Sequence, residues 1–167
     1  MMDSSSGIEV GELRGAATVR VVGKGTHLNS HLLKEYATHV LEKKGSPFQL
    51  DLSACSYMDS TFLGMLAGMG VRRCQNQSHP IRVIGISPRV KGMMEGLGID
   101  HLFEMIDGPV PAAALRPMDS RPASPDQKSR DMLEAHETLV AVSSSNEAKF
   151  RDVIALLRES AEKSGSS

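Results

Sequence analysis

Residues 48–70 constrain the fold more than any other part of the chain, because their periodicity changes partway through. Apolar and polar side chains alternate over residues 48–53, which predicts a half-buried strand. Apolar residues then recur at helical spacing on one face of a predicted helix: Phe62, Met65, Leu66 and Met69. Between the two lie Asp59, Ser60 and Thr61, which are typical of helix N-caps. The pattern predicts a strand that turns into a helix and presents a hydroxyl group at the positive end of the helix dipole.

The length and composition of the chain fit one globular domain with an appendage. Its 167 residues are 40% hydrophobic, enough for a core, and a net charge of −1 favours neither a nucleic-acid groove nor an anionic membrane as partner. The N-terminal residues lack the pattern of a signal peptide, and no stretch approaches the roughly 20 apolar residues of a membrane span. Two cysteines, Cys55 and Cys74, fit free thiols in a reducing compartment better than a disulfide. We therefore expect a soluble, cytoplasmic protein.

The remaining patterns predict an α/β domain over residues 8–107, after a flexible N-terminus at 1–7. Further strands are expected at 8–13, 17–21, 81–86 and 102–106, and glycines at 23 and 25 should end the second of them. Helices should begin at Asn29-Ser30 and at Ser87-Pro88; Lys43-Lys44-Gly45 should end the first helix and Gly98 the second. Strands joined through helices run parallel, so we expect a mixed sheet of four to five strands with helices packed on it.

The composition changes abruptly after residue 107. Five prolines between residues 108 and 130 predict an extended, largely unstructured linker. Residues 131–162 then predict a helical hairpin, in which Ser144 and Glu147 fit a capping box at the start of the second helix. That helix has an apolar face made of Phe150, Val153, Ile154 and Leu157. Two short helices alone are marginal, so the hairpin should pack on the domain, on a second copy in a homodimer, or on another protein.

Two motifs and the residues that end the predicted domain carry a family resemblance. The first motif is Gln-Leu-Asp-Leu-Ser at 49–53 with Met-Asp-Ser-Thr-Phe-Leu-Gly at 58–64, and the second is Ile-Gly-Ile-Ser-Pro-Arg-Val at 84–90. The ending is Gly-Ile at 98–99 followed by Leu-Phe at 102–103. With the order of elements, these residues resemble the STAS domain, the fold of bacterial anti-sigma factor antagonists. The resemblance covers residues 8–107.

The resemblance implies a role in partner switching during transcription regulation. Antagonists of this family bind an anti-sigma factor that is often also a serine kinase; phosphorylation releases the antagonist, and a serine phosphatase resets it. Carried over to this chain, the phosphorylated residue is Ser60, and Asp59, Ser60, Thr61 and Phe62 form the partner-binding site. Thr61 and Phe62 depart from the serine and glycine usual at these positions, and the Phe62 ring would reshape the docking surface.

The chemistry of the residues is compatible with such a switch and also with plainer alternatives. A phosphoserine carries about −1.5 to −2 charges, which a helix N-terminus tolerates but a partner packed over it would not. Asp59 and Ser60 could instead merely cap a helix. At the level of the whole protein, the fold could serve as a non-phosphorylated scaffold subunit of a signalling or lipid-transport complex, or as a ligand sensor or enzyme.

Evidence for catalysis or for a bound metal is weak in the sequence. No histidine is spaced from Ser60 in a way that suggests a catalytic base, and no glycine loop for phosphate binding is present. His27 and His31 could in principle share a metal, but a third ligand is not evident. We therefore expect a binding protein, not an enzyme, without a cofactor or metal and without direct nucleic-acid contact.

Overall fold

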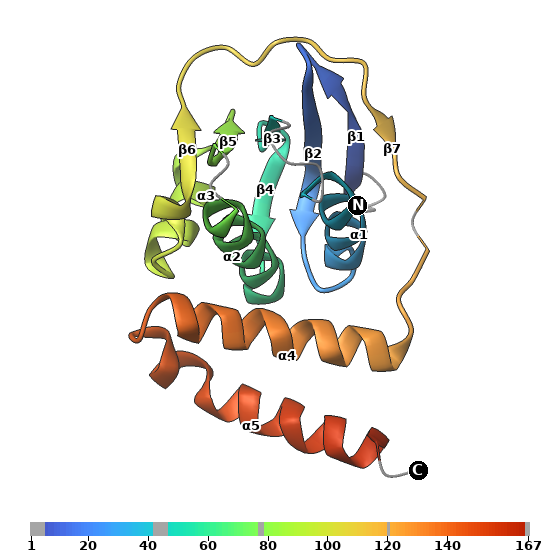
Figure 1. Ribbon diagram of the computed structural model, residues 1–167, viewed down its shortest axis with the longest axis vertical. Coiled ribbons are helices and arrows are strands. Elements are labelled where there is room, and N and C mark those ends of the chain that lie inside the picture. Colours follow the sequence, from blue (N-terminus) through green and yellow to red (C-terminus); the bar gives the residue numbers. More distant parts are fainter. Residues whose placement is uncertain (1–5, 42–46, 77–78, 120, 166–167) are drawn as a thin grey trace.

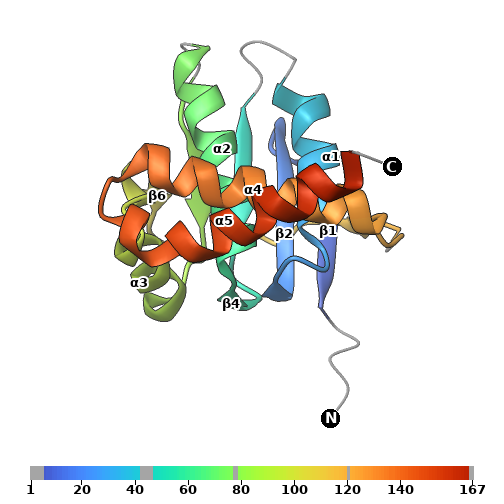
Figure 2. The ribbon, with the colours of Figure 1, turned by 90° about the horizontal axis from the view of Figure 1, so that it is seen from below.

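The computed structural model describes residues 6–41, 47–76, 79–119 and 121–165. A single sheet carries helices α1 and α2 side by side on one face, and the helices α4 and α5 lie across the end of this layer as a hairpin (Figures 1 and 2). The strands are β1 (Gly7–Leu13), β2 (Ala16–Gly25), β3 (Phe48–Asp51), β4 (Cys55–Met58), β5 (Ile81–Ile84), β6 (Phe103–Ile106) and β7 (Arg116–Pro117). The helices are α1 (Ser30–Leu41), α2 (Ser60–Gln75), α3 (Pro88–Gly96), the short 3-10 helix η1 (Asp100–Leu102), α4 (Pro125–Val142) and α5 (Asn146–Gly165).

The sheet is mixed, as predicted, but the described residues form seven strands in it, not four to five. Its order is β6-β5-β3-β2-β1-β7, with β4 pairing with the far end of β2. The strands β2, β3, β5 and β6 are parallel neighbours, and β1 is antiparallel to β2. The prediction missed β4 because it placed the end of β2 at its glycines. The strand in fact continues to Gly25, because Gly23, at φ 75°, lies at a β-bulge that shifts the register and turns β2 toward β4.

The central strand β3 is buried on both faces, which corrects the predicted half-buried strand. Its apolar residues, Phe48 and Leu50, belong to the main core. On the other face Gln49 donates a hydrogen bond to the hydroxyl of Thr18, and Asp51 pairs with Arg20 at 2.8 Å. Apolar and polar residues therefore do alternate along β3. The polar side chains, however, pair with side chains of the neighbouring strand and do not face solvent.

The proline-rich segment is more ordered than predicted. Arg116 and Pro117 form β7, which pairs with the edge strand β1, and the amide of Met118 donates to the carbonyl of Ile8. Leu115 packs closely against Gly11, so the segment lies flat on this edge. The linker is extended, as expected, but it closes the edge of the sheet.

The helical hairpin is present and packs on the domain of the same chain. Helix α4 contacts α2, and α5 contacts α4 (Figure 1). Helix α4 begins at Pro125, earlier than the predicted residue 131, because Ser124 caps it and accepts from the amide of Gln127. The predicted capping box does not form in the described residues 143–147. Instead Asn146, fully buried, donates to the carbonyls of Leu97 and Leu139 and clamps the turn.

The predicted glycine stop of α3 is found at Gly98, which has a φ of 69°. The predicted end of α1 at Lys43, Lys44 and Gly45 lies outside the described residues, as do positions 1–5 of the N-terminal segment. The strand β1 begins at Gly7, the last residue of the segment predicted to be flexible.

Candidate functional site

Asp59 caps helix α2 and also holds the preceding loop. Its Oδ1 accepts a hydrogen bond from the amide of Phe62 at 2.9 Å. Its Oδ2 accepts from the amide of His27 at 2.9 Å and lies 3.1 Å from Nδ1 of the same histidine. The carboxylate therefore ties the loop after β2 to the start of α2, and both oxygens are engaged within the fold.

Ser60 is the first residue of α2, and its hydroxyl is bound by a histidine from the hairpin. The Oγ of Ser60 lies 2.8 Å from Nε2 of His136 on α4. The Nδ1 of His136 lies 2.6 Å from the carbonyl oxygen of Met132. A carbonyl can only accept, so Nδ1 carries the proton; in a neutral ring Nε2 is then the acceptor, and Ser60 donates to it.

His136 is not an exposed contact residue. It is only 3% exposed, and its ring packs edge-on against Phe150 of α5, with ring centroids 5.1 Å apart. The sequence prediction missed this residue because 76 positions separate it from Ser60. A usable signal existed: His136 lies on the same helical face as Met132 and Leu139, which are part of the apolar stripe.

Thr61 and Phe62 point into the fold. Thr61 is 3% exposed and Phe62 is fully buried. The Phe62 ring occupies the space above Gly25, where a Cβ atom would come within 2.8 Å of the ring. The bulky residue at this position is thus matched by a glycine at the end of β2. The four predicted site residues therefore fall into two pairs. Asp59 and Ser60 are half-buried, whereas Thr61 and Phe62 are buried and support them from inside the fold.

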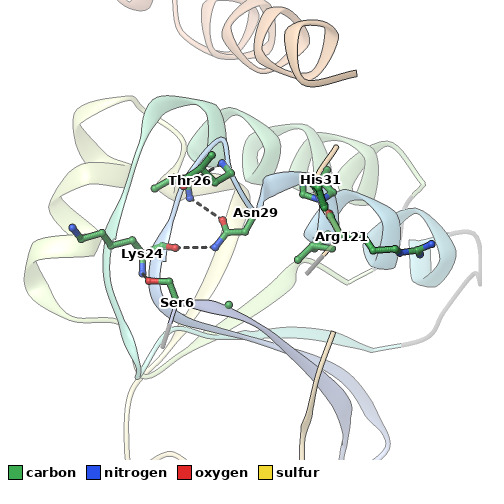
Figure 3. Close-up of a pocket in the computed structure, with 10 residues that line it drawn as sticks. Ser6, Lys24, Thr26, Asn29, His31 and Arg121 are labelled. Carbon is green, nitrogen blue, oxygen red and sulfur yellow. Dashed lines mark hydrogen bonds between the residues drawn. The ribbon is translucent and has the colours of Figure 1, made fainter. Parts of the chain in front are cut away.

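A hollow of about 500 Å³ lies beside this site, on the loop that also carries His27. Figure 3 shows the side chain of Asn29 bridging the amide of Thr26 and the carbonyl of Lys24. His31 at its rim contacts the backbone carbonyl of Arg121. The side-chain amide of Asn29, which lines the hollow, is used to fix the loop and so supports the shape of the neighbouring site.

Other candidate groups take no part in this arrangement. His27 and His31 bond to different partners, Asp59 and Arg121, and no cluster of three possible metal ligands occurs in the described ranges. Cys55 and Cys74 are free thiols, the first buried and the second exposed. Burial raises the pKa of the Cys55 thiol, against the opposing effect of hydrogen bonds with the backbone of Tyr57 and Gly25.

Fold and sequence together define the class of protein. The sequence model of the family described as Mlab, STAS domain, matches residues 8–107, and the chain belongs to this STAS domain family. No curated protein sequence matches the chain. Within the described residues, no helix is long and apolar enough to cross a membrane.

Solved structures share the fold at low sequence identity. The unphosphorylated form of the anti-sigma factor antagonist SpoIIAA is 15% identical, with a TM-score of 0.50, over 61% of this chain and 89% of that one. A putative anti-sigma factor antagonist from Thermotoga maritima is 16% identical, with a TM-score of 0.53, over 60% of this chain and 86% of that one. These likenesses show the fold of the domain. Each likeness covers only 60–61% of this chain, so the linker and the hairpin are compatible with being additions to the shared fold.

Proposed function

We propose that this protein is an anti-sigma factor antagonist, a binding protein and not an enzyme, that acts in the cytoplasm. In this role it binds an anti-sigma factor with serine kinase activity and frees the sigma factor. The observation that carries the proposal is the position of Ser60, the first residue of α2 behind the capping Asp59, on a STAS fold. The likeness to SpoIIAA, itself an anti-sigma factor antagonist, supports it.

Phosphorylation of Ser60 is the proposed switch. The Ser60 oxygen takes the γ-phosphoryl group of ATP, ADP leaves, and the hydroxyl proton is released to a base of the kinase. The new dianionic group lies at the N-terminal end of α2, where the helix dipole offsets its charge, so the domain stays folded. A partner packed over Ser60 meets new charge and bulk and dissociates. A serine phosphatase then restores the binding form.

The four predicted site residues take different parts in this proposal. Ser60 accepts the phosphate, and Asp59 fixes the start of α2 and presents its carboxylate beside the acceptor. Thr61 and Phe62, which are buried, set the position of the first turn from inside. They shape the docking surface without contributing exposed atoms to it.

The test is phosphorylation of the purified full chain by the purified anti-sigma kinase of the same organism, with ATP and site mapping by mass spectrometry. We expect phosphate on Ser60 and none in Ser60→Ala, which should still bind the unmodified kinase, whereas Ser60→Asp should bind more weakly. Ser56, exposed on the neighbouring strand, is the internal control. Phosphate on Ser56 or Thr61 with none on Ser60 contradicts the site. Absence of both binding and phosphorylation would favour a scaffold subunit of a signalling or lipid-transport complex.

A further inference from the structure

We infer that the α2 face beneath helix α4 is the partner-binding surface of the domain, and that the hairpin closes this surface in the free protein. The identity of the partner rests on the proposed function, but the closure is a property of this chain alone. A partner that takes the place of α4 must present a helix with small residues on its contact face. The hairpin must leave before Ser60 can be reached.

The first argument is the way in which α4 covers Ser60. The hydroxyl is bound at 2.8 Å by His136, which is itself buried between α2 and Phe150. A kinase needs the Ser60 oxygen free and in line with the γ-phosphate of its nucleotide. With α4 in this position, the hydroxyl of Ser60 donates to an imidazole that cannot move aside without displacing the helix.

The second argument is the closeness of the contact one turn further along α2. A Cβ atom at Gly64 would overlap the carbonyl oxygen of Ala135 and come within 2.7 Å of the Ala135 Cβ. The two helices therefore touch through backbone, and neither a phosphate nor a partner side chain can enter between them. Close approach through small residues is a helix-on-helix contact, so the surface left by α4 fits a helix.

The third argument is that the hairpin can leave without dismantling the domain. The main core of buried apolar residues comes from the strands and from α1, α2 and α3, and among the described residues Leu139 is the one contribution of the hairpin to it. Val142 of α4 and Phe150 of α5, both partly buried, also pack against this core. The hairpin is further held by polar ties. Lys34 of α1 bonds to Asp131 and Glu134, Asn146 bonds to Leu97, and Lys149 bonds to the carbonyl of Gly96.

These ties spread across three helices of the domain. The hairpin is held by α1, by α2 and by the end of α3, in line with its position across the end of the helix layer (Figure 2). Polar contacts of this kind can exchange with water, so their loss is less costly than the exposure of a large apolar face. The polar contacts between the hairpin and the domain therefore fix one position of the hairpin and still allow it to detach.

The experiment measures the accessibility of position 60 in the full chain, without any partner. The reporter is the thiol introduced by Ser60→Cys, in a background that also carries Cys74→Ser to remove the exposed native thiol, and a maleimide is the probe. Cys55, which is 5% exposed, serves as an internal reference for unfolding of the domain. The displacing variant is Ala135→Leu, opposite Gly64, and the matched control is Ala155→Leu on the exposed side of α5.

We expect the introduced thiol at position 60 to react at least tenfold faster in Ala135→Leu than in the parent, with Ala155→Leu unchanged and Cys55 unreactive in all three. If Cys55 also reacts in Ala135→Leu, that variant has unfolded, and Lys34→Met replaces it because it loosens α4 from a distance. Equal rates of labelling at position 60 in the parent and in a folded displaced variant overturn the closure.

A second measurement separates this inference from the proposed function. Chains with Ser60 intact, with and without Ala135→Leu, are incubated with the purified anti-sigma kinase and ATP. We expect phosphorylation of Ser60 to be at least tenfold faster in Ala135→Leu. Equal rates in both chains leave the proposed function standing and overturn the inference. If labelling shows closure but neither chain is phosphorylated, the closure stands and the proposed function fails.

Discussion

The backbone carbonyl of Ala135 occupies the space that a side chain at Gly64 would need. A Cβ atom there would lie 2.6 Å from the Ala135 carbonyl carbon, inside any real contact distance. Helix α4 can take its position only because residue 64 lacks a side chain. Gly64 belongs to the motif that resembles other STAS domains. A glycine of the domain motif is therefore also the residue against which the hairpin packs.

Gly64→Ala should therefore loosen the hairpin. The methyl group meets backbone, which cannot rotate away, so we expect a loss of about 1–3 kcal/mol in the free energy of unfolding. The matched control is Gly92→Ala on α3, where a Cβ atom meets nothing within 4 Å. There the gain in helix propensity should stabilise the protein by up to about 1 kcal/mol. Urea unfolding of both variants is the measurement, and equal stability of the two would contradict the tight contact.

Lys34→Met should weaken the docking of α4 on α1. The substitution leaves the carboxylate of Asp131, whose side chain is 4% exposed, with its bond to Gln127 but without a cation. We expect a cost of about 1–3 kcal/mol, because an unpaired buried charge is expensive. Arg158→Met breaks the exposed pair with Glu137 between α5 and α4 and should cost less than about 1 kcal/mol. Hydrogen exchange of α4 amides would compare the two, and similar protection in both would contradict the prediction.

The same contact gives a pH dependence. Burial lowers the pKa of Lys34, but hydrogen bonds and charge attraction from Glu134 and Asp131 outweigh it and raise the pKa above its ordinary 10.5. A cation with a raised pKa stabilises the folded state fully below its unfolded value and loses that contribution as pH rises through the folded value. Docking of α4 should therefore be unaffected between pH 7 and 9 and weaken above about pH 10.5. Thermal melts of the parent and Lys34→Met should converge there.

Asp59→Ala should destabilise the start of α2. Loss of the cap costs about 1 kcal/mol, and the contacts with His27 add to it, so we expect about 1–2 kcal/mol. Asp59→Asn is the milder variant, because its amide oxygen can still cap Phe62 but its NH2 group cannot accept from the amide of His27. We expect it to cost about 1 kcal/mol, less than Asp59→Ala. If Asp59 also shapes the docking surface, kinase affinity should fall in Asp59→Asn by more than its loss of stability explains. Unchanged affinity in that variant would reduce Asp59 to a cap.

The local pattern of the sequence was enough to predict most of the domain. The change of period between residues 48 and 70 predicted β3 and α2, and the residues around Asp59 predicted the cap that the structure shows. Ser87, Pro88 and Gly98 likewise predicted both ends of α3. These features depend on neighbours within a few residues, which is the range that periodicity and capping describe.

The features that sequence analysis missed depend on distant partners. The bulge at Gly23, the strand β7 and the contact of Ser60 with His136 each join segments that are remote in the chain. The polar face of β3 looked exposed because Asp51 carries a charge, and only the tertiary structure places Arg20 beside it. The apolar stripe of the hairpin predicted that it would dock, but not that it would dock on the candidate site.

The pairing of β7 with β1 sets the length of the tether that holds the hairpin. Only six residues separate Pro117 from Ser124, the cap of α4. A chain of that length reaches about 20 Å when extended, so the start of a released α4 stays within that distance of Pro117. Tethers of this length give effective concentrations in the millimolar range. A partner present at micromolar concentration must therefore bind the α2 face about a thousandfold more tightly than the hairpin does in order to displace half of it.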